Sequence, residues 1–527
     1  MPKAAKLSYI ESKKKGLYAK VDGWQGKLAG ALTVLIMCVQ PLYINWEKYN
    51  RLTWHKFIFF VIYIVCALTA VVIIWIFRVT RKPSLLPREK LSVADWAVLG
   101  FAAVTLVSAI FSPFGGETDV WAGGFERLDG AITQLLYVAV YFIVSRWYVP
   151  KKRHFMLFGI SAILIAIIGI LQFYGMDFLK LWPNDVPEYR APNFYNIFFR
   201  TTLGNVDVVS AYTCAAVLLC GFLFVRMKSK WQPLWLAASA MSFWMMGVAD
   251  TDSGRVGVIA ATFLALPFII ETLKTLGRAA ILLSSWLVVY TLQKLFYETL
   301  ILKTSTASGL LPFITAAAVL LAAGLLLMHF GKERDADAPV KWKMGVILIA
   351  ACLVAGLIGV EALGRRAAES DEPGGILYEA REVLHGNIQD ELGTNRVYIW
   401  RNALKVFPNH PIIGSGPDTF YQAFPEEAQM RYDQNYDKAH NEYIQILICQ
   451  GILGLLCYMV FLVCVLQKAT PKAFGNPIIM AVLAAFTGYI VQAFFNISMP
   501  IISQMPWVFA GILSSRKVRE TTPDRLE

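Results

Sequence analysis

Charged side chains are scarce in this sequence. Asp, Glu, Lys and Arg together make up 16% of its 527 residues, whereas 57% of the residues are hydrophobic. The mean hydropathy is +0.52. Such a composition excludes an ordinary soluble domain, because the apolar runs are long enough to cross a bilayer as helices. The scarcity of charge therefore predicts an all-α polytopic membrane protein.

Signatures of several enzyme classes are also missing. The sequence has no phosphate-binding P-loop, no dinucleotide-binding glycine fingerprint, no cluster of metal ligands and no internal repeat. All eight cysteines fall inside apolar runs, so we expect neither a disulfide framework nor a zinc site. The apolar runs hold few charges near their centres, which argues against a secondary transporter. We therefore expect no cofactor and no bound metal.

Fourteen apolar runs are long enough to be membrane spans. The first run follows a Lys-rich leader and has no small-residue cleavage site after it, so we interpret it as a retained span and not as a signal peptide. The predicted spans are about 28–45, 57–77, 93–112, 130–149, 155–174, 206–225, 233–249, 256–273, 279–297, 310–330, 344–362, 440–466, 477–495 and 500–515.

The net charge of +12 is distributed as a membrane topology requires. Lys and Arg resist translocation, and the basic clusters all fall on one side if both termini are cytoplasmic. The loop 46–56, with Lys48, Arg51 and Lys56, is the exception. The charge thus indicates topology and contact with anionic membrane lipids, and no nucleic-acid partner is expected. The clusters lie at 13–15, 78–88, 151–153, 226–230, 274–278, 332–343, 468–472 and 516–519.

One outer segment, 364–439, is long enough to form a small soluble subdomain. Its stretch "NRVYIWRNALKVF" (395–407) predicts a helix, and "PIIGSGPDTF" (411–420) predicts a turn rich in Pro and Gly. The predicted helical face consists of Val397, Trp400, Leu404 and Phe407. We divide the chain into an N-terminal bundle of about eleven spans (1–363), this extracytoplasmic loop subdomain (364–439) and a C-terminal part with about three spans (440–527).

Three arginines stand out on the predicted outer side: Arg127, Arg255 and Arg396. A planar guanidinium suits phosphate oxygens, so several arginines facing one cavity would hold a diphosphate without a metal. Arg127 alone is equally well explained as an ordinary ion-paired loop residue. Arg255 directly precedes an apolar run, where a charge must lie at the interface or point into a polar cavity.

His440 and Asn441 lie where the outer segment meets an apolar run. The dipole of a helix N-terminus disfavours the imidazolium ion, and a neutral imidazole can act as a general base near pH 7. The alternative is that His440 is only an interfacial residue. Asp250 and Asp252 form a D-x-D motif, which could bind a metal ion but is better explained as a helix end that orients Arg255.

These stretches resemble the O-antigen ligase and O-antigen polymerase superfamily of bacterial membrane glycan ligases, which includes protein O-oligosaccharyltransferases. The resemblance spans "GGFERLDG" (123–130), "TLGN" (202–205), "DTDSGR" (250–255) and above all "RVYIWRNALKVFPNHPIIGSGPDTF" with "AHNEYIQILICQGILG". The sequence differs from the family pattern at Gly254, which separates Ser253 from Arg255, and at Val206-Asp207, which replace Pro-Asn.

The resemblance implies a metal-independent, inverting glycosyltransferase of the membrane-embedded (GT-C-like) type. Its implied donor is a glycan linked to undecaprenyl diphosphate, and its acceptor is a hydroxyl of a glycan, lipid or protein. The active site would lie on the outer face of the bacterial cytoplasmic membrane. The implied catalytic residues are His440, Arg396 and Arg255, and the implied substrate-binding residues are Arg127, Asn441, Asn205, Arg200 and Trp400.

Two alternatives remain open at this stage. A polymerase would join glycan repeats on the same lipid carrier, and it shares these motifs with the ligases. A flippase for lipid-linked glycans belongs to another class and would fit the high number of spans. The flippase would need charges deep inside the spans, and it would not need a base in an outer loop.

Overall fold

The computed structural model describes residues 21, 23–81, 90–124, 127–182, 198–303, 309–332, 342–369, 375–429 and 436–520. This part of the chain is helical apart from one antiparallel pair of short strands, β1 (Phe199–Arg200) and β2 (Gly204–Asn205). The helices after the first stretch are η1 (Leu35–Val39), α2 (Gln40–Leu42), α3 (Leu52–Arg81), α4 (Val93–Ile110), α5 (Ala131–Trp147), α6 (Lys152–Phe173), α8 (Val206–Arg226), α9 (Gln232–Ala249), α10 (Asp252–Ile269), α11 (Leu273–Phe296), η3 (Tyr297–Ile301), α12 (Leu311–Phe330), α13 (Trp342–Ala368), α14 (Ile376–Leu384), α15 (Arg396–Val406), η4 (Phe407–Asn409), α16 (Phe420–Ala423), α17 (Glu426–Gln429), α18 (Glu442–Ala473), α19 (Pro477–Gln492), η5 (Ala493–Phe495), α20 (Met505–Ser514) and α21 (Arg516–Glu520).

Within the described residues, 10 helices are long and apolar enough to cross a membrane, so the protein is a multi-pass membrane protein. The ten comprise the first helix, Gly23–Leu42, together with α3, α4, α6, α8, α10, α11, α12, α18 and α19. The other four predicted spans also coincide with helices, namely α5, α9, α13 and α20. With 10 residues, α20 is roughly 15 Å long, about half of the hydrocarbon core. The predicted span 500–515 is therefore too long, because its first residues form a turn before this short helix.

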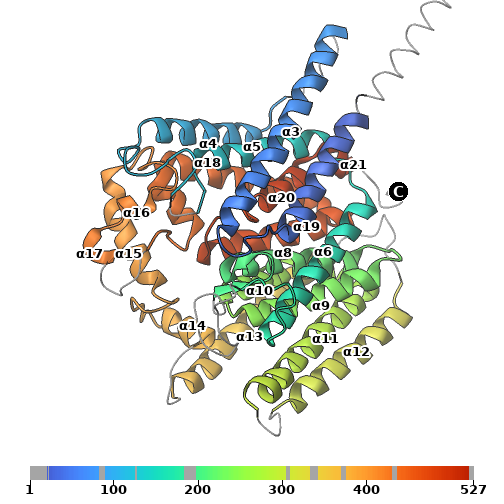
Figure 1. The fold of residues 1–527 in the computed structure, drawn as a ribbon. Helices are drawn as coiled ribbons and strands as arrows, with labels where there is room; N and C mark the ends of the chain where they lie inside the picture. Colours follow the sequence, from blue (N-terminus) through green and yellow to red (C-terminus); the bar gives the residue numbers. More distant parts are fainter. Residues whose placement is uncertain are drawn as a thin grey trace, which may run out of the picture.

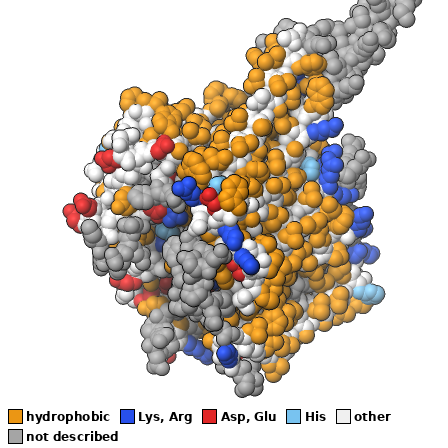
Figure 2. Space-filling model, in the orientation of Figure 1, with side chains coloured by type: hydrophobic (Ala, Val, Ile, Leu, Met, Phe, Trp, Pro, Cys, Tyr) orange, Lys and Arg blue, Asp and Glu red, His pale blue; other side chains and the backbone are white. Residues whose placement is uncertain are grey.

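The centre of the bundle is α8, whose residues from Val208 to Val225 are all buried. It packs against α9, α10 and α19. By contrast, α12 packs along α11 and leaves most of its apolar surface exposed, as a lipid-facing helix would. A broad band of hydrophobic side chains covers the helices in Figure 2. Most acidic side chains in this view lie on the left, on the side of α14–α17 in Figure 1.

Lys56 accounts for part of the basic charge in the loop 46–56. The structure places it inside α3, fully buried. Its ammonium group donates to the backbone carbonyls of Gln40 (2.7 Å) and Pro41 (3.1 Å). These two carbonyls lie at the carboxyl end of the first helix, where backbone carbonyls have no partner within their own helix and a lysine can satisfy them. Lys56 therefore caps the end of the first span and is not a loop charge.

The helices α14–α17 belong to the predicted outer segment 364–439 and gather on one side of the bundle (Figure 1). The predicted helix in 395–407 is present as α15, and only part of its predicted face packs: Trp400 and Phe407 contact the apolar cluster of this segment. Tyr398, Ile399 and Ala403 are buried against Phe420 and neighbouring apolar residues of the outer segment. Leu404 is 49% exposed. Periodicity alone did not identify Tyr398, Ile399 and Ala403 as the most buried positions. The reason is that α15 packs both against other residues of the outer segment and against η5.

The membrane helix that follows the outer segment is broken at Gly451. This residue has φ 68° and ψ −172°, a conformation that only glycine adopts readily. The break interrupts the helical hydrogen bonds of α18 in the apolar interior, where free backbone groups are costly. The turn at 411–416 lies against the break and supplies the missing partners.

Four backbone hydrogen bonds join the turn to both sides of the break. The N–H groups of Ser415 and Gly416 donate to the carbonyls of residues 448 and 449, each at 2.9 Å. The N–H groups of Ile452 and Leu453 donate to the carbonyls of residues 411 and 412, at 2.9 and 3.2 Å. A Cβ on Gly414 would lie 2.3 Å from the backbone of Cys449. The Pro-Ile-Ile-Gly-Ser-Gly stretch thus supplies, with its own backbone, the hydrogen bonds that the broken helix lacks, and we call this stretch the plug.

Replacing Gly451 by Ala tests this plug. The new Cβ would lie 2.3 Å from the carbonyl oxygen of Ile412, and the backbone conformation alone costs about 1–3 kcal/mol for other residues. We expect a clear drop in the thermal unfolding temperature of the detergent-solubilised protein. Gly359→Ala in α13 is the matched control, because a Cβ there meets nothing within 4 Å. Equal unfolding temperatures for the two variants would contradict the proposed strain at Gly451.

The predicted topology can be tested by labelling single cysteines in intact cells. Glu427 is exposed in α17, and Lys228 is exposed in the turn after α8. On a background without native cysteines, Glu427→Cys should react with a membrane-impermeant maleimide, and Lys228→Cys should react only after the membrane is permeabilised. The reverse pattern would put the outer segment on the cytoplasmic side.

Candidate active site

His440 lies immediately before Asn441, the N-cap residue of α18. Its backbone is in the left-handed region with φ 48°, which residues with a Cβ rarely adopt. The side chain is 28% exposed, and its Nδ1 atom lies 3.8 Å from Oδ2 of Asp207. Strained backbone of this kind persists only where the surrounding structure holds it, and it is frequent at functional sites.

The ring of His440 is held in its neutral form. Burial lowers the pKa of His440, and the nearby charge of Arg396 lowers the pKa further, whereas the carboxylate of Asp207 acts in the opposite direction. The net shift is below the ordinary histidine value. The sequence predicted a neutral ring from the helix dipole, but burial is the larger cause.

Arg396 begins α15 and faces the same carboxylate. One of its terminal nitrogens lies 3.8 Å from Oδ1 of Asp207, and the other donates to the carbonyl of Gly393 at 2.8 Å. Its Nε atom is buried and has no hydrogen-bond partner among the described residues. Asp207 therefore lies between His440 and Arg396, and the Nε donor of Arg396 is not used by any described residue.

Arg127 makes a two-pronged ion pair with Asp437, at 2.5 Å from Nε and 3.2 Å from a terminal nitrogen. The charges of both Arg127 and Asp437 act on His440. Three residues that the sequence singled out, Arg127, Arg396 and His440, thus lie together although they come from three separate outer segments.

Three further residues predicted from the sequence make hydrogen bonds to the backbone next to this group. Asn441 accepts hydrogen bonds from the N–H groups of residues 443 and 444, each at 3.0 Å, and thereby caps α18. Trp400 donates from Nε1 to the carbonyl of Ala439 at 2.9 Å. Asn205 caps α8 by accepting from the N–H of Asp207 at 2.8 Å. These contacts position the backbone beside His440 and Asp207.

Arg255 and Arg200 are placed differently. Arg255 pairs with Asp252 at 2.6 Å and lies 3.8 Å from Asp250, so both carboxylates of the D-x-D motif face it. The charges of Asp252 and Arg396 both affect the pKa of Glu379 in α14. Arg255, which pairs with Asp252, therefore belongs to a neighbouring cluster. Neither arginine is among the strongest charges on His440.

Arg200 is the last residue of β1 and belongs to an aromatic cluster. Its guanidinium carbon lies 5.9 Å from the ring centre of Phe173 and 5.8 Å from that of Trp182. One terminal nitrogen donates to the carbonyl of Phe199 at 2.9 Å, and the residue is 8% exposed. These contacts place the guanidinium of Arg200 among aromatic rings.

Sequence reasoning missed the acidic residues of the site and one lysine. Lys438 is 1% exposed, and its ammonium nitrogen lies 2.5 Å from Asp418 and 3.3 Å from Asp129. Burial lowers the pKa of Lys438, but the two carboxylates raise it more, so the ammonium group stays charged. Asp129 thus pairs with Lys438, whereas its sequence neighbour Arg127 pairs with Asp437. The signal available in the sequence was the charged pair Asp437-Lys438 directly before His440.

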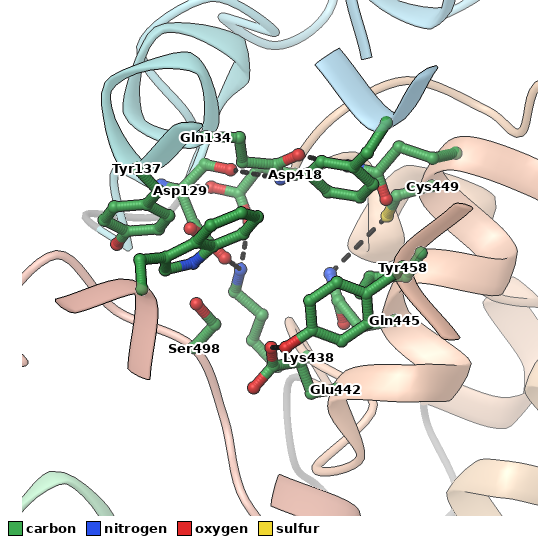
Figure 3. Close-up of a pocket in the computed structure, with 14 residues that line it drawn as sticks. Asp129, Gln134, Tyr137, Asp418, Lys438, Glu442, Gln445, Cys449, Tyr458 and Ser498 are labelled. Carbon is green, nitrogen blue, oxygen red and sulfur yellow. Dashed lines mark hydrogen bonds and ion pairs between the residues drawn. The ribbon is translucent and has the colours of Figure 1, made fainter. Parts of the chain in front are cut away.

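Lys438 and its two carboxylates line a small cavity of about 30 Å³ (Figure 3). This is roughly the room that one water molecule takes up. Glu442 lies on the opposite side of the cavity and accepts hydrogen bonds from Tyr458 (2.6 Å) and Tyr489 (3.3 Å). The lining of this cavity does not include His440, Asp207 or Arg396.

Comparison with known proteins locates the family signal on this part of the chain. The family model described as O-antigen ligase (Wzy_C) matches residues 299–459. No curated protein matches the chain. The matched range runs from η3 into α18 and contains Arg396, the turn at 411–416 and His440, whereas Arg127 and Asp207 lie outside it. The protein is therefore a multi-pass membrane protein whose residues 299–459 match the family model of the O-antigen ligases, a family of enzymes.

Proposed function

We propose that this protein transfers a glycan from an undecaprenyl-diphosphate-linked donor to an acceptor hydroxyl at the outer face of the bacterial cytoplasmic membrane. The family supports a lipid-linked glycan ligase or transferase in general terms. The observation that carries the finer proposal is the meeting of His440 with Arg396, Arg127 and Asp207 at the N-terminus of a broken membrane helix.

The donor diphosphate is the part of the substrate that this group suits best. Arg396 has an unpaired Nε donor beside the ring of His440. Arg127 adds a second guanidinium, and the N-terminus of α18 adds a positive helix end. Guanidinium groups bind phosphate oxygens through parallel hydrogen bonds. Together they would counter the charge that develops on the diphosphate as it leaves.

His440 is the proposed general base. Its Nδ1 atom lies towards Asp207, which leaves Nε2 to accept the proton of the acceptor hydroxyl. The acceptor oxygen then forms a bond to the anomeric carbon, and the bond from this carbon to the diphosphate oxygen breaks. The leaving group takes that electron pair, and the configuration at the anomeric carbon inverts.

Asp207 gives the imidazolium a nearby counter-charge. Before the reaction the ring is neutral, because burial and Arg396 disfavour its protonated form. When the ring takes up the proton, its positive charge develops 3.8 Å from the Asp207 carboxylate. Opposite charges at this distance attract strongly in a partly buried site. Asp207 would therefore favour the transition state more than the resting enzyme.

The direct test uses purified protein, a lipid-linked glycan and candidate acceptors. A glycan covalently attached to a separate glycan, lipid or protein acceptor supports the proposed ligase. Longer glycans on the same lipid carrier would show a polymerase. Movement of the donor across proteoliposomes without any new glycosidic bond would show a flippase and contradict the proposal.

Replacing His440 and Arg396 should separate catalysis from donor binding. His440→Ala should lower the transfer rate by roughly 10²–10⁴-fold, the usual contribution of a positioned general base. Donor binding should be largely kept, because the arginines hold the diphosphate. Arg396→Ala should weaken donor binding as well as the rate. The measurements are single-turnover transfer and donor binding to the solubilised protein.

The pH profile provides the control for His440. Because burial lowers the pKa of His440, the active neutral form should persist down to pH values below the ordinary histidine range. The kcat/KM of the wild-type protein should then fall only on the acid side of about pH 6.5, and this fall should be absent in His440→Ala. A folded His440→Ala protein with a near wild-type rate would leave His440 as an interfacial residue.

Transfer should also survive removal of divalent cations. Arginines supply the positive charge near the proposed diphosphate, and Asp250 and Asp252 both face Arg255. We expect the rate to be unchanged after EDTA treatment and dialysis. Loss of activity that Mg²⁺ or Mn²⁺ restores would assign the two aspartates a metal-binding role and overturn the arginine-based account.

A further inference from the structure

A buried ammonium group ties three outer segments together two residues before His440. Lys438 contributes the positive charge from the strap 436–441, which we define as the segment between the outer helices and α18. Asp129 comes from the loop before α5, and Asp418 comes from the turn before α16. Figure 3 shows the lysine reaching between these carboxylates, with Glu442 on the other side.

A second ion pair of opposite polarity lies beside the first. In the loop, Arg127 is positive and Asp129 is negative, whereas in the strap Asp437 is negative and Lys438 is positive. A shift of the strap by one residue would bring Arg127 opposite Lys438, and two like charges in a partly buried place repel each other. The two pairs together therefore fix the register of the strap against the loop.

The strap also holds the strained residue of the site. His440 has φ 48°, and the residue before it, Ala439, is fixed on both sides of its peptide unit. The N–H of Ala439 donates to Oε1 of Gln445, and its carbonyl accepts from Trp400, each at 2.9 Å. Displacement of Lys438 would therefore be passed through Ala439 to the imidazole.

We propose that Lys438 is a positioning residue for His440: by binding Asp129 and Asp418, it holds the strap so that the imidazole stays beside Asp207. The proposal rests on the proposed function, because it gives Lys438 a part in glycan transfer through His440. Lys438 itself is 1% exposed and lines a small cavity whose lining includes neither His440 nor Arg396, so it is not expected to touch the substrate.

Two variants test this role, and a third provides the control. Lys438→Met removes the ammonium group at similar length, and Asp418→Asn is the milder change, because the Asp129 pair remains. Glu271→Gln is the control, since Glu271 forms a buried ion pair with Arg226 next to α11, away from the strap. Loss of any buried ion-pair partner is destabilising, so all three changes share that general effect.

The readouts separate positioning from stability. Per folded molecule, Lys438→Met and Asp418→Asn should lower kcat by roughly 10- to 100-fold, because small misplacements of catalytic groups have effects of this size. The KM for the lipid-linked donor should stay within about threefold, since the arginines remain. Modification of His440 by diethyl pyrocarbonate, followed by mass spectrometry, should become several-fold faster as the ring is released. Glu271→Gln should change neither kcat nor the rate of His440 modification.

Each outcome decides the proposal. Folded Lys438→Met protein with wild-type kcat and unchanged His440 modification would show that Lys438 has no positioning role. An equal loss of kcat in Glu271→Gln would reduce the effect to general destabilisation. If Lys438→Met does not fold, Asp418→Asn gives the answer by the same measurements. If the wild-type protein transfers no glycan, the proposed function fails, and the rate of His440 modification still tests whether Lys438 positions the ring.

Discussion

A broken helix inside a membrane requires hydrogen-bond partners for its freed backbone groups, and much of this structure depends on that requirement. The break at Gly451 frees carbonyls before it and N–H groups after it, and the turn at 411–416 satisfies both sets. Ser108 of α4 adds a hydrogen bond to the carbonyl of Cys449 at 2.8 Å. The outer segment is thereby anchored inside the bundle. The short first half of α18 is anchored with it, and its N-terminus carries Asn441 and His440.

The charges around His440 are nearly balanced before any substrate binds. Arg127 faces Asp437, and Arg396 faces Asp207. In the proposed reaction, a diphosphate would compete with these carboxylates for the guanidinium groups, so a donor with two phosphates would be favoured over a weaker anion. The balance also explains why a partly buried imidazole can lie among two arginines: the carboxylates offset their repulsion of the protonated ring.

Much of this arrangement was predictable from local patterns. Long apolar runs predicted helices at every place where spans were expected, because a single apolar segment of this length satisfies its own backbone groups in lipid by forming a helix. The position of His440 at the start of a membrane helix followed from the polar-to-apolar change after residue 439. Arg127 and Arg396 lie near His440, and their shared role in holding a diphosphate stays a prediction. Arg200 lies beside Phe173 and Trp182, and its role in substrate binding likewise stays a prediction.

The sequence by itself determined the class of the protein, the approximate spans and the helix start that carries His440, since these depend on composition and on short-range periodicity. Only the tertiary structure decided which charges meet. Arg127 and Asp437 are 310 positions apart, and Lys438 and Asp129 are 309 positions apart. The face that α15 buries likewise depends on Phe420 and on η5, which lie outside that helix. Such pairings depend on how distant segments pack, and no local pattern in the chain records that packing.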